Sequence, residues 1–196
     1  RDDSTAYVQF DISWSVSWRY TNVNHDAAWV FFKVLPEGQA GWRHVTLEGT
    51  GTNPPGYVTG TGTGIEFLVP SDRMGLFVRR STEGAGTLSV TNAKAVWNFA
   101  SNGLVKTEKV RLQALAVEMV FVAEGSYWLG SGVTNSGELC EGGGGANPFL
   151  VTNAGPILCS NAVGCLWGGK QSGGDSMGGN GILSNAFPNG YSAFYC

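Results

Sequence analysis

The stretch Val8–Trp18 (VQFDISWSVSW) decides the fold of this chain. Every even position in it holds an apolar residue and every odd position a polar one. Successive side chains of a strand point to opposite faces, so this alternation predicts a half-buried β-strand with one apolar and one polar face. At ~3.3 Å per residue the strand would reach roughly 36 Å, about twice the length of a typical strand.

A strand of this length could serve its own sheet or complete another molecule's sheet. We predict that residues from about Thr5 to Ile12 pair with a neighbouring subunit, while Trp14 to Trp18 stays in its own sandwich. Val8, Phe10 and Ile12 share one face, with the spacing of side chains that enter alternate pockets of an acceptor sheet. The alternative is that the whole strand pairs within its own chain, because ordinary sandwiches also begin with a strand.

Composition limits the classes of protein to consider. The chain has 196 residues, of which 42% are hydrophobic and only 14% are charged, and 30 are glycine. A low charge content with abundant small polar residues is typical of a secreted or cell-surface β-protein, whose signal peptide would already be removed. The net charge of −3 without a basic cluster predicts no nucleic-acid partner. No apolar run approaches the ~20 residues of a membrane span, so we expect no membrane insertion.

Charge and glycine divide the chain into two regions. Residues 1–123 hold 22 of the 27 charged residues, whereas residues 124–196 hold 18 of the 30 glycines and all four cysteines. We therefore predict a β-sandwich region with a long N-terminal strand over 1–123. A glycine-rich, disulfide-stabilised β-region over 124–196 would pack on it.

The rest of the first region also reads as strands separated by turn residues. Ala27–Leu35 is nearly continuously apolar, as in a central strand covered on both faces. In Lys109–Val122 the apolar residues fit helical spacing but also alternate in two phases. Because the flanks are β-rich and helix caps are lacking, we favour a second long strand with a β-bulge near Gln113. Asn102-Gly103 suggests a tight hairpin turn. Further short strands are predicted at Trp42–Leu47, Ile65–Val69, Gly75–Arg80, Thr87–Thr91 and Ala95–Phe99. This pattern predicts an all-β protein, with immunoglobulin-like sandwich packing favoured over a barrel.

The cysteines are Cys140, Cys159, Cys165 and Cys196. An even number in a secreted-looking chain predicts two disulfides, with three connectivities possible. Zinc is disfavoured because the spacings contain no C-x-x-C and no histidine lies in this region. An intermolecular bond by Cys196 is the remaining alternative.

Candidate catalytic residues are few. The segment Gly174–Gly178 (GDSMG) matches the G-x-S-x-G pattern of a hydrolase nucleophile at Ser176. That chemistry needs a strand before the serine, a helix after it and a histidine base, whereas glycine and polar residues flank it here. His25 is interpreted as a turn residue with local hydrogen bonds, His44 as a strand residue, and Arg79-Arg80 as a solvated strand end. We predict no catalytic residue, no cofactor and no metal site.

Several stretches resemble one family: FDISWSVSWR (10–19), DAAWVFFK (26–33), GWRHVTL (41–47), VEMVFVAEGSYWLG (117–130), NPFLVTN (147–153) and FPNGYSAFYC (187–196). They are similar to secreted bacterial proteins in which a β-rich region precedes a formylglycine-generating-enzyme-like (sulfatase-modifying-factor-like) domain. The resemblance covers most of the chain. In that family the segment similar to AFYC leads into the enzyme-like domain, so none of that domain's catalytic residues is carried over to this chain.

Three functional hypotheses follow from these observations. The first is an extracellular structural subunit that self-associates, as an oligomer or a filament, by strand donation or β-augmentation. The second is a carbohydrate-binding or adhesive module, which a row of exposed tryptophan or tyrosine rings would support. The third is the accessory, non-catalytic region of a formylglycine-generating-enzyme-like protein.

Overall fold

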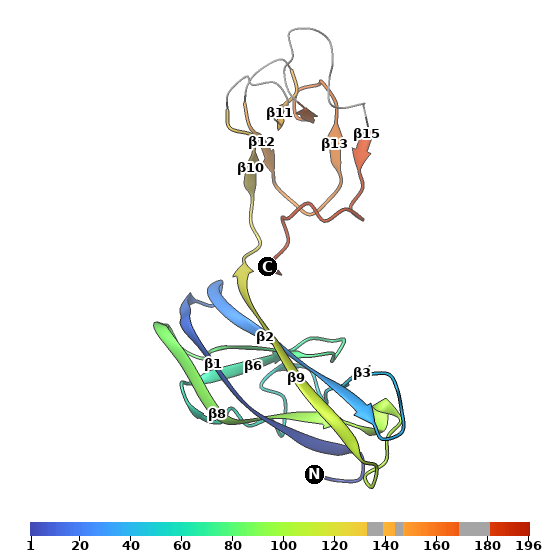
Figure 1. Ribbon diagram of the computed structural model, residues 1–196. Coiled ribbons are helices and arrows are strands. Elements are labelled where there is room, and N and C mark those ends of the chain that lie inside the picture. Colours follow the sequence, from blue (N-terminus) through green and yellow to red (C-terminus); the bar gives the residue numbers. More distant parts are fainter. Residues whose placement is uncertain (133–138, 144–146, 169–180) are drawn as a thin grey trace. The chain divides into compact units, whose positions relative to one another are not determined.

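The computed structural model describes residues 1–132, 139–143, 147–168 and 181–196 (Figure 1). These residues form strands and one short 3-10 helix, which confirms the all-β class and a sandwich-like arrangement of antiparallel sheets. The finer assignment to immunoglobulin-like packing stays a prediction. The chain divides into two compact units, Arg1–Phe121 with Tyr195–Cys196, and Val122–Phe194. The division falls close to the predicted boundary, but the last two residues belong to the first unit.

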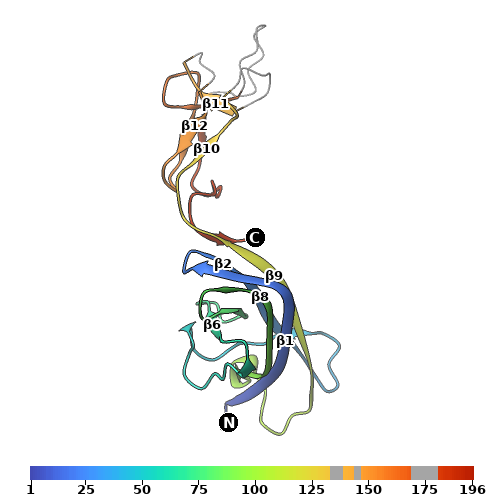
Figure 2. The ribbon, with the colours of Figure 1, turned by 90° about the vertical axis from the view of Figure 1, so that its left-hand side faces the viewer.

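The first unit is built around two long strands that form a hairpin. Its elements are β1 (Thr5–Thr21), β2 (Asn24–Pro36), β3 (Arg43–His44), β4 (Gly51–Thr52), β5 (Thr61–Gly62), β6 (Ile65–Val69), β7 (Leu76–Arg80), β8 (Gly84–Asn98), the 3-10 helix η1 (Ala100–Asn102) and β9 (Val110–Val122). The strand order is β4-β6-β7-β2-β1-β8-β5, and β9 pairs with the other edge of β2. Figure 2 shows the strong curvature of β1.

The core lies between the β1–β8 pair and the strands β2, β6 and β7. Its fully buried members include Phe32, Phe67, Leu76 and Leu88. Along β2 the even-numbered residues from Ala28 to Val34 face this core, while the odd-numbered residues Trp29, Phe31 and Lys33 are half-buried on the outer side. The alternation of β2 therefore assigns one face to the core and leaves a partly exposed apolar face outside.

Strand β1 pairs with β8 of its own chain from Thr5 opposite Asn98 to Arg19 opposite Gly84. Val8 is buried, and Phe10 and Ile12 are half-buried against the core. The predicted division of this strand, with Thr5–Ile12 on a neighbouring subunit, is therefore not found. The structure has the alternative, in which the whole strand pairs within its own chain.

A β-bulge in β8 explains why the sequence predicts two short strands, Thr87–Thr91 and Ala95–Phe99, where the structure has one long strand. Phe10 lies opposite Ala93 and Ile12 opposite Val90, so Thr91 and Asn92 together face Asp11. Asn92 has a left-handed φ of 60°, and its N–H donates to the Asp11 carboxylate at 2.8 Å. The bulge interrupts the alternation, but the strand continues from Gly84 to Asn98.

A second bulge, in β1, reverses which side chains point inward. Trp14 lies opposite Leu88 and Ser17 opposite Gly86, so Ser15 and Val16 together face Thr87. Beyond this point Ser17 and Arg19 are buried, while Val16 is 71% exposed. The apolar face predicted to run from Val8 to Trp18 therefore ends at Trp14, because one extra residue shifts the period-2 pattern.

Two further predictions need correction. Lys109–Val122 does form a strand, as predicted. Its register with β2 is unbroken from Val110 opposite Pro36 to Val120 opposite Asp26, so the predicted bulge near Gln113 is absent. Asn102-Gly103 is not a hairpin turn. It ends the 3-10 helix, where Gly103 has a φ of 70° and its N–H donates to the Ala100 carbonyl.

The second unit has a small core of Val151, Ile157 and Leu166. Its strands are β10 (Tyr127–Leu129), β11 (Leu139–Glu141), β12 (Phe149–Val151), β13 (Ile157–Cys159), β14 (Leu166–Gly168) and β15 (Gly181–Leu183). They form the pair β10-β12 and the sheet β11-β14-β13-β15. The last strand, β16 (Phe194–Tyr195), pairs with β9.

The predicted disulfides are not found, because all four cysteines carry free thiols. Cys140 and Cys165 are buried and Cys159 is half-buried in the second unit. Cys196 is exposed and belongs to the first unit. The second unit thus holds an odd number of cysteines, so two disulfides cannot form inside it.

The bulge in β8 gives the first testable prediction. Asn92→Gly loses the side-chain contacts of Asn92, but its free energy of unfolding should stay within ~0.5 kcal/mol of the wild-type value, because glycine accepts a left-handed φ. Asn92→Val loses the same side-chain contacts but should be about 1–2 kcal/mol less stable than Asn92→Gly, since a branched side chain is strained there. Urea denaturation of both variants measures this difference, and equal stabilities would contradict the assigned backbone conformation.

Candidate functional site

A buried cluster of charged and polar side chains lies where β1 turns into β2. The Glu66 carboxylate binds Arg19 Nη1 at 2.8 Å and Arg79 Nε at 2.7 Å. Arg19 also donates to the Arg80 carbonyl and to the Asn22 side chain. Breaking such a buried pair leaves a charge without compensation and typically costs about 3–5 kcal/mol. The cluster therefore holds the hairpin against β6 and β7.

Asp26 closes the inner side of this cluster. Its carboxylate accepts hydrogen bonds from Trp14 Nε1 at 2.7 Å, from Ser17 Oγ at 3.0 Å and from the Trp18 N–H at 3.0 Å. Ser17 in turn accepts a bond from Arg80 Nε at 3.1 Å. Ser17 reaches Asp26 only because the bulge at Ser15–Val16 turned it inward.

His25 is the one fully buried titratable ring of the cluster, with 0% exposure. Its Nε2 lies 3.0 Å from Arg79 Nη1 and 3.1 Å from Tyr195 Oη, and its ring stacks on Phe121 at 4.8 Å. Burial lowers the pKa of His25 to about 4, and the charges of Arg79 and Arg19 act in the same direction. At 0% exposure this ring, stacked on Phe121, does not meet the requirement that a general base reach its substrate.

The environments of His25 and Arg79-Arg80 differ from their predicted ones. His25 bonds to residues far away in the sequence rather than within its turn, and Arg79 is largely buried rather than solvated. His44 lies in β3 as predicted, with its ring 5.5 Å from that of Phe31, and burial lowers its pKa. No pattern in the sequence signalled the cluster, because its members come from four separate strands.

The open edge of β9 is the second candidate. One edge of β9 pairs with β2 over the whole stretch from Val110 to Val120. On the other edge, β16 and Cys196 pair with the end of β9, where Val120 exchanges backbone hydrogen bonds of 2.7 and 3.0 Å with Cys196. Within the described part of the chain, the residues of β9 before Val120 have no strand on this edge. Backbone groups of successive residues point to alternate edges. The N–H and C=O groups of Leu112, Ala114, Ala116 and Glu118 therefore face the same open edge as those of Val120.

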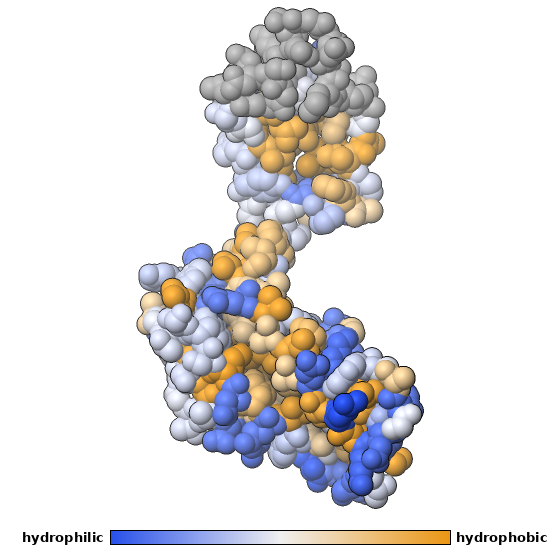
Figure 3. Space-filling model, viewed as in Figure 1, coloured by the Kyte–Doolittle hydropathy of each residue, from blue (hydrophilic) through white to orange (hydrophobic). Residues whose placement is uncertain are grey.

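Both faces of β9 are apolar and open to solvent. Leu112 is 39% exposed, Val117 51% and Val120 41%, and Ala114 and Ala116 are also exposed. Figure 3 shows apolar residues that follow the course of β9 across this face of the first unit. Edge strands normally carry charges, proline or a short length that prevents pairing. β9 has no charged residue or proline from Leu112 to Val117, as in a strand covered on both faces.

An aromatic hollow adjoins β9 on the outer face of β2. It has a volume of about 340 Å³ and is lined by Trp29, Pro70, Asp72, Phe77, Met119 and Tyr195. The Phe77 and Tyr195 rings stack at 4.0 Å, and Trp29 lies 4.7 Å from Phe77. These rings pack on one another, so this hollow does not present the row of open ring faces that would support carbohydrate binding.

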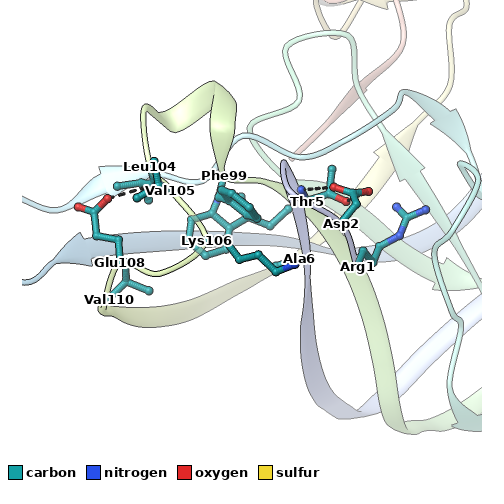
Figure 4. A pocket seen from close by; sticks show the side chains of 11 residues that line it. Arg1, Asp2, Thr5, Ala6, Phe99, Leu104, Val105, Lys106, Glu108 and Val110 are labelled. Carbon is teal, nitrogen blue, oxygen red and sulfur yellow. Dashed lines mark hydrogen bonds between the residues drawn. The ribbon is translucent and has the colours of Figure 1, made fainter.

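A smaller cavity, of about 180 Å³, lies between the starts of β1 and β9 (Figure 4). Ala6 and Val110 contribute from the two strands, and Trp97, Phe99 and Leu104 are among the apolar residues that line it. At its edge the Asp2 carboxylate accepts hydrogen bonds from Thr5 and Ser4, which lower the pKa of Asp2. The cavity shows that the core is not completely closed at the β1–β9 side of the sandwich.

Other predicted features can be placed only in part. The segment Gly174–Gly178 with Ser176 lies outside the described residues. Among the residues that are described, no group of three or more His, Cys, Asp or Glu side chains could hold a metal ion. The same residues contain no helix that is long and apolar enough to cross a membrane. No protein-family model, curated protein or solved structure matches the chain.

The burial of His25 predicts a specific pH dependence of stability. The ring titrates near 6.5 when unfolded but near 4 when folded, so the folded chain binds fewer protons between these values. The free energy of unfolding should therefore fall as the pH drops from about 6.5 to about 4. His25→Gln removes this contribution. Between about pH 6.5 and about pH 4, the variant should therefore lose less free energy of unfolding than wild type, by up to roughly 3 kcal/mol.

Urea denaturation of both proteins at several pH values between 7 and 4 tests this prediction. Carboxylates that titrate in the same range are present in both proteins, so the difference between the two curves isolates His25. Curves that stay parallel over the whole range would contradict the neutral, buried state of the ring.

Proposed function

We propose that this protein is an extracellular structural subunit that assembles with other copies by strand pairing at the open edge of β9. The observation that carries the proposal is the pairing of β9. One edge is bonded to β2 from Val110 to Val120, while the other faces solvent over most of that length in the described structure. Added strands gain affinity from main-chain hydrogen bonds and specificity from alternate side chains.

The energies of such a contact favour a reversible assembly. A ladder of roughly ten backbone hydrogen bonds at about 1 kcal/mol each is similar to the ~4–15 kcal/mol cost of association. Burial of exposed apolar side chains such as Leu112 and Val117, at about 25 cal/mol per Å², would then supply the net affinity. We therefore expect assembly to depend on protein concentration.

This proposal moves the pairing surface from the N-terminal strand to β9. Val8, Phe10 and Ile12 pack in their own core, and donation of their strand would break its ladder with β8. The open edge of β9 can pair without any loss of internal contacts. The low charge content of the chain supports an extracellular setting, and the assembly itself needs no catalytic residue or cofactor.

Ala114→Pro tests the proposal directly. The N–H of Ala114 faces the open edge, so proline there removes a donor for a partner strand and leaves the ladder with β2 intact. We expect wild type to self-associate with increasing concentration, and Ala114→Pro to require at least tenfold more protein to do so. Sedimentation velocity over a broad concentration range measures this, with the thermal midpoint as a check that the variant is folded.

Ala114→Ser is the matched control, because it alters the same side chain and keeps the N–H. It should assemble like wild type. Wild-type protein that stays monomeric at high concentration, or a folded Ala114→Pro variant that assembles as well as wild type, would overturn the proposal.

A further inference from the structure

The partner strand can be identified more closely, on the basis of the proposed function. We infer that β9 pairs antiparallel with β9 of a second copy, around a two-fold axis that passes through Ala114. Three properties of the edge lead to this arrangement: its length, the direction of its backbone groups and the distribution of its charges.

The length of the open edge limits the register. The backbone groups that face this edge belong to even-numbered residues, and those of Val120 are already bonded to Cys196. The open positions therefore run from Val110, where the strand begins, to Glu118. Two copies can use all of these positions only when Val110 lies opposite Glu118 and Leu112 opposite Ala116, which places Ala114 opposite itself. A shift of the axis to Leu115 or beyond brings Val120 into the ladder, where Cys196 already occupies it.

The charges favour the antiparallel direction. Lys109 and Arg111 lie at the beginning of the edge and Glu118 near its end, and all three are exposed. An antiparallel pair brings Lys109 and Arg111 of each strand near Glu118 of the other, across the two faces of the pair rather than as directly opposed side chains, whereas a parallel pair would bring like charges together. Glu108, which is also exposed, lowers the net positive charge at the beginning of the edge. Between these ends both copies present the uncharged segment 112–117 (LQALAV).

The side chains are also compatible with this register. On one face Leu112 would pack beside Ala116 of the second copy, and the two Ala114 methyl groups would meet on the axis. On the other face Leu115 would lie opposite Gln113, and Val117 opposite the aliphatic stem of Arg111. The contact is isologous, so it closes as a dimer, and a filament would need a second, different contact.

Cysteine cross-linking tests the register. Gln113→Cys and Leu115→Cys are made as separate proteins in a Cys196→Ser background, because the Cys196 thiol is exposed. In the inferred dimer, positions 113 and 115 form a non-hydrogen-bonded pair with a Cα separation of about 4.5 Å, which lies within disulfide range. After mild oxidation, a mixture of the two proteins should yield a cross-linked dimer that non-reducing electrophoresis detects and mass spectrometry assigns to positions 113 and 115.

Each variant oxidised alone provides the control. Like positions are two residues out of step in this register, so each protein alone should cross-link at least several-fold less than the mixture. Stronger cross-linking of Leu115→Cys alone would place the axis at residue 115 and overturn the register. If none of the samples cross-links while Ala114→Pro still prevents assembly, the symmetric pairing is wrong but the proposed function stands. If wild-type protein never assembles, both are overturned.

Discussion

The ladder between β2 and β9 is the interaction on which the other features of the first unit depend. Buried backbone N–H and C=O groups need partners, and in a sheet each strand obtains them from both of its neighbours. One edge of β2 is shared in sequence by β1, β7 and β3, and the other edge is bonded to β9. β9 itself has a comparable neighbour on one edge only, within the described residues. This difference singles out β9 as the strand that can accept a partner.

The neighbouring polar cluster sets one end of this open edge. His25 contacts both Phe121 of β9 and Tyr195, so the segment that contains Tyr195 and Cys196 is held against the end of β9. The ion pairs of Glu66 with Arg19 and Arg79 fix the position of His25 through Arg79. Their stability depends on complete pairing, because each unpaired buried charge would cost several kcal/mol. The cluster thus determines where the proposed strand pairing can begin.

The period-2 patterns predicted many of the strands, because they record which side chains are buried. Ile65–Val69 forms a strand with the bounds expected from its sequence, and Ala27–Leu35 lies within β2. The burial of Ser17 and Arg19 could not be predicted in this way, since it depends on a bulge that shifts the alternation. The open edge of β9 was also hidden. Its sequence predicted a second long strand, but a sequence does not show which neighbours a strand lacks. Similarly, the cysteine count suggested two disulfides but did not reveal that Cys196 belongs to the first unit.

Amide hydrogen exchange at single-residue resolution tests the central claim most directly, because it measures each edge of β9 separately. In dilute protein, the odd-numbered amides from Gln113 to Val117, which face β2, should exchange slowly, and the even-numbered amides from Leu112 to Glu118 should exchange fast. In concentrated protein the even-numbered amides should become protected as well. Slow exchange of both sets in dilute monomer, or fast exchange of the even-numbered set at every concentration, would contradict the account.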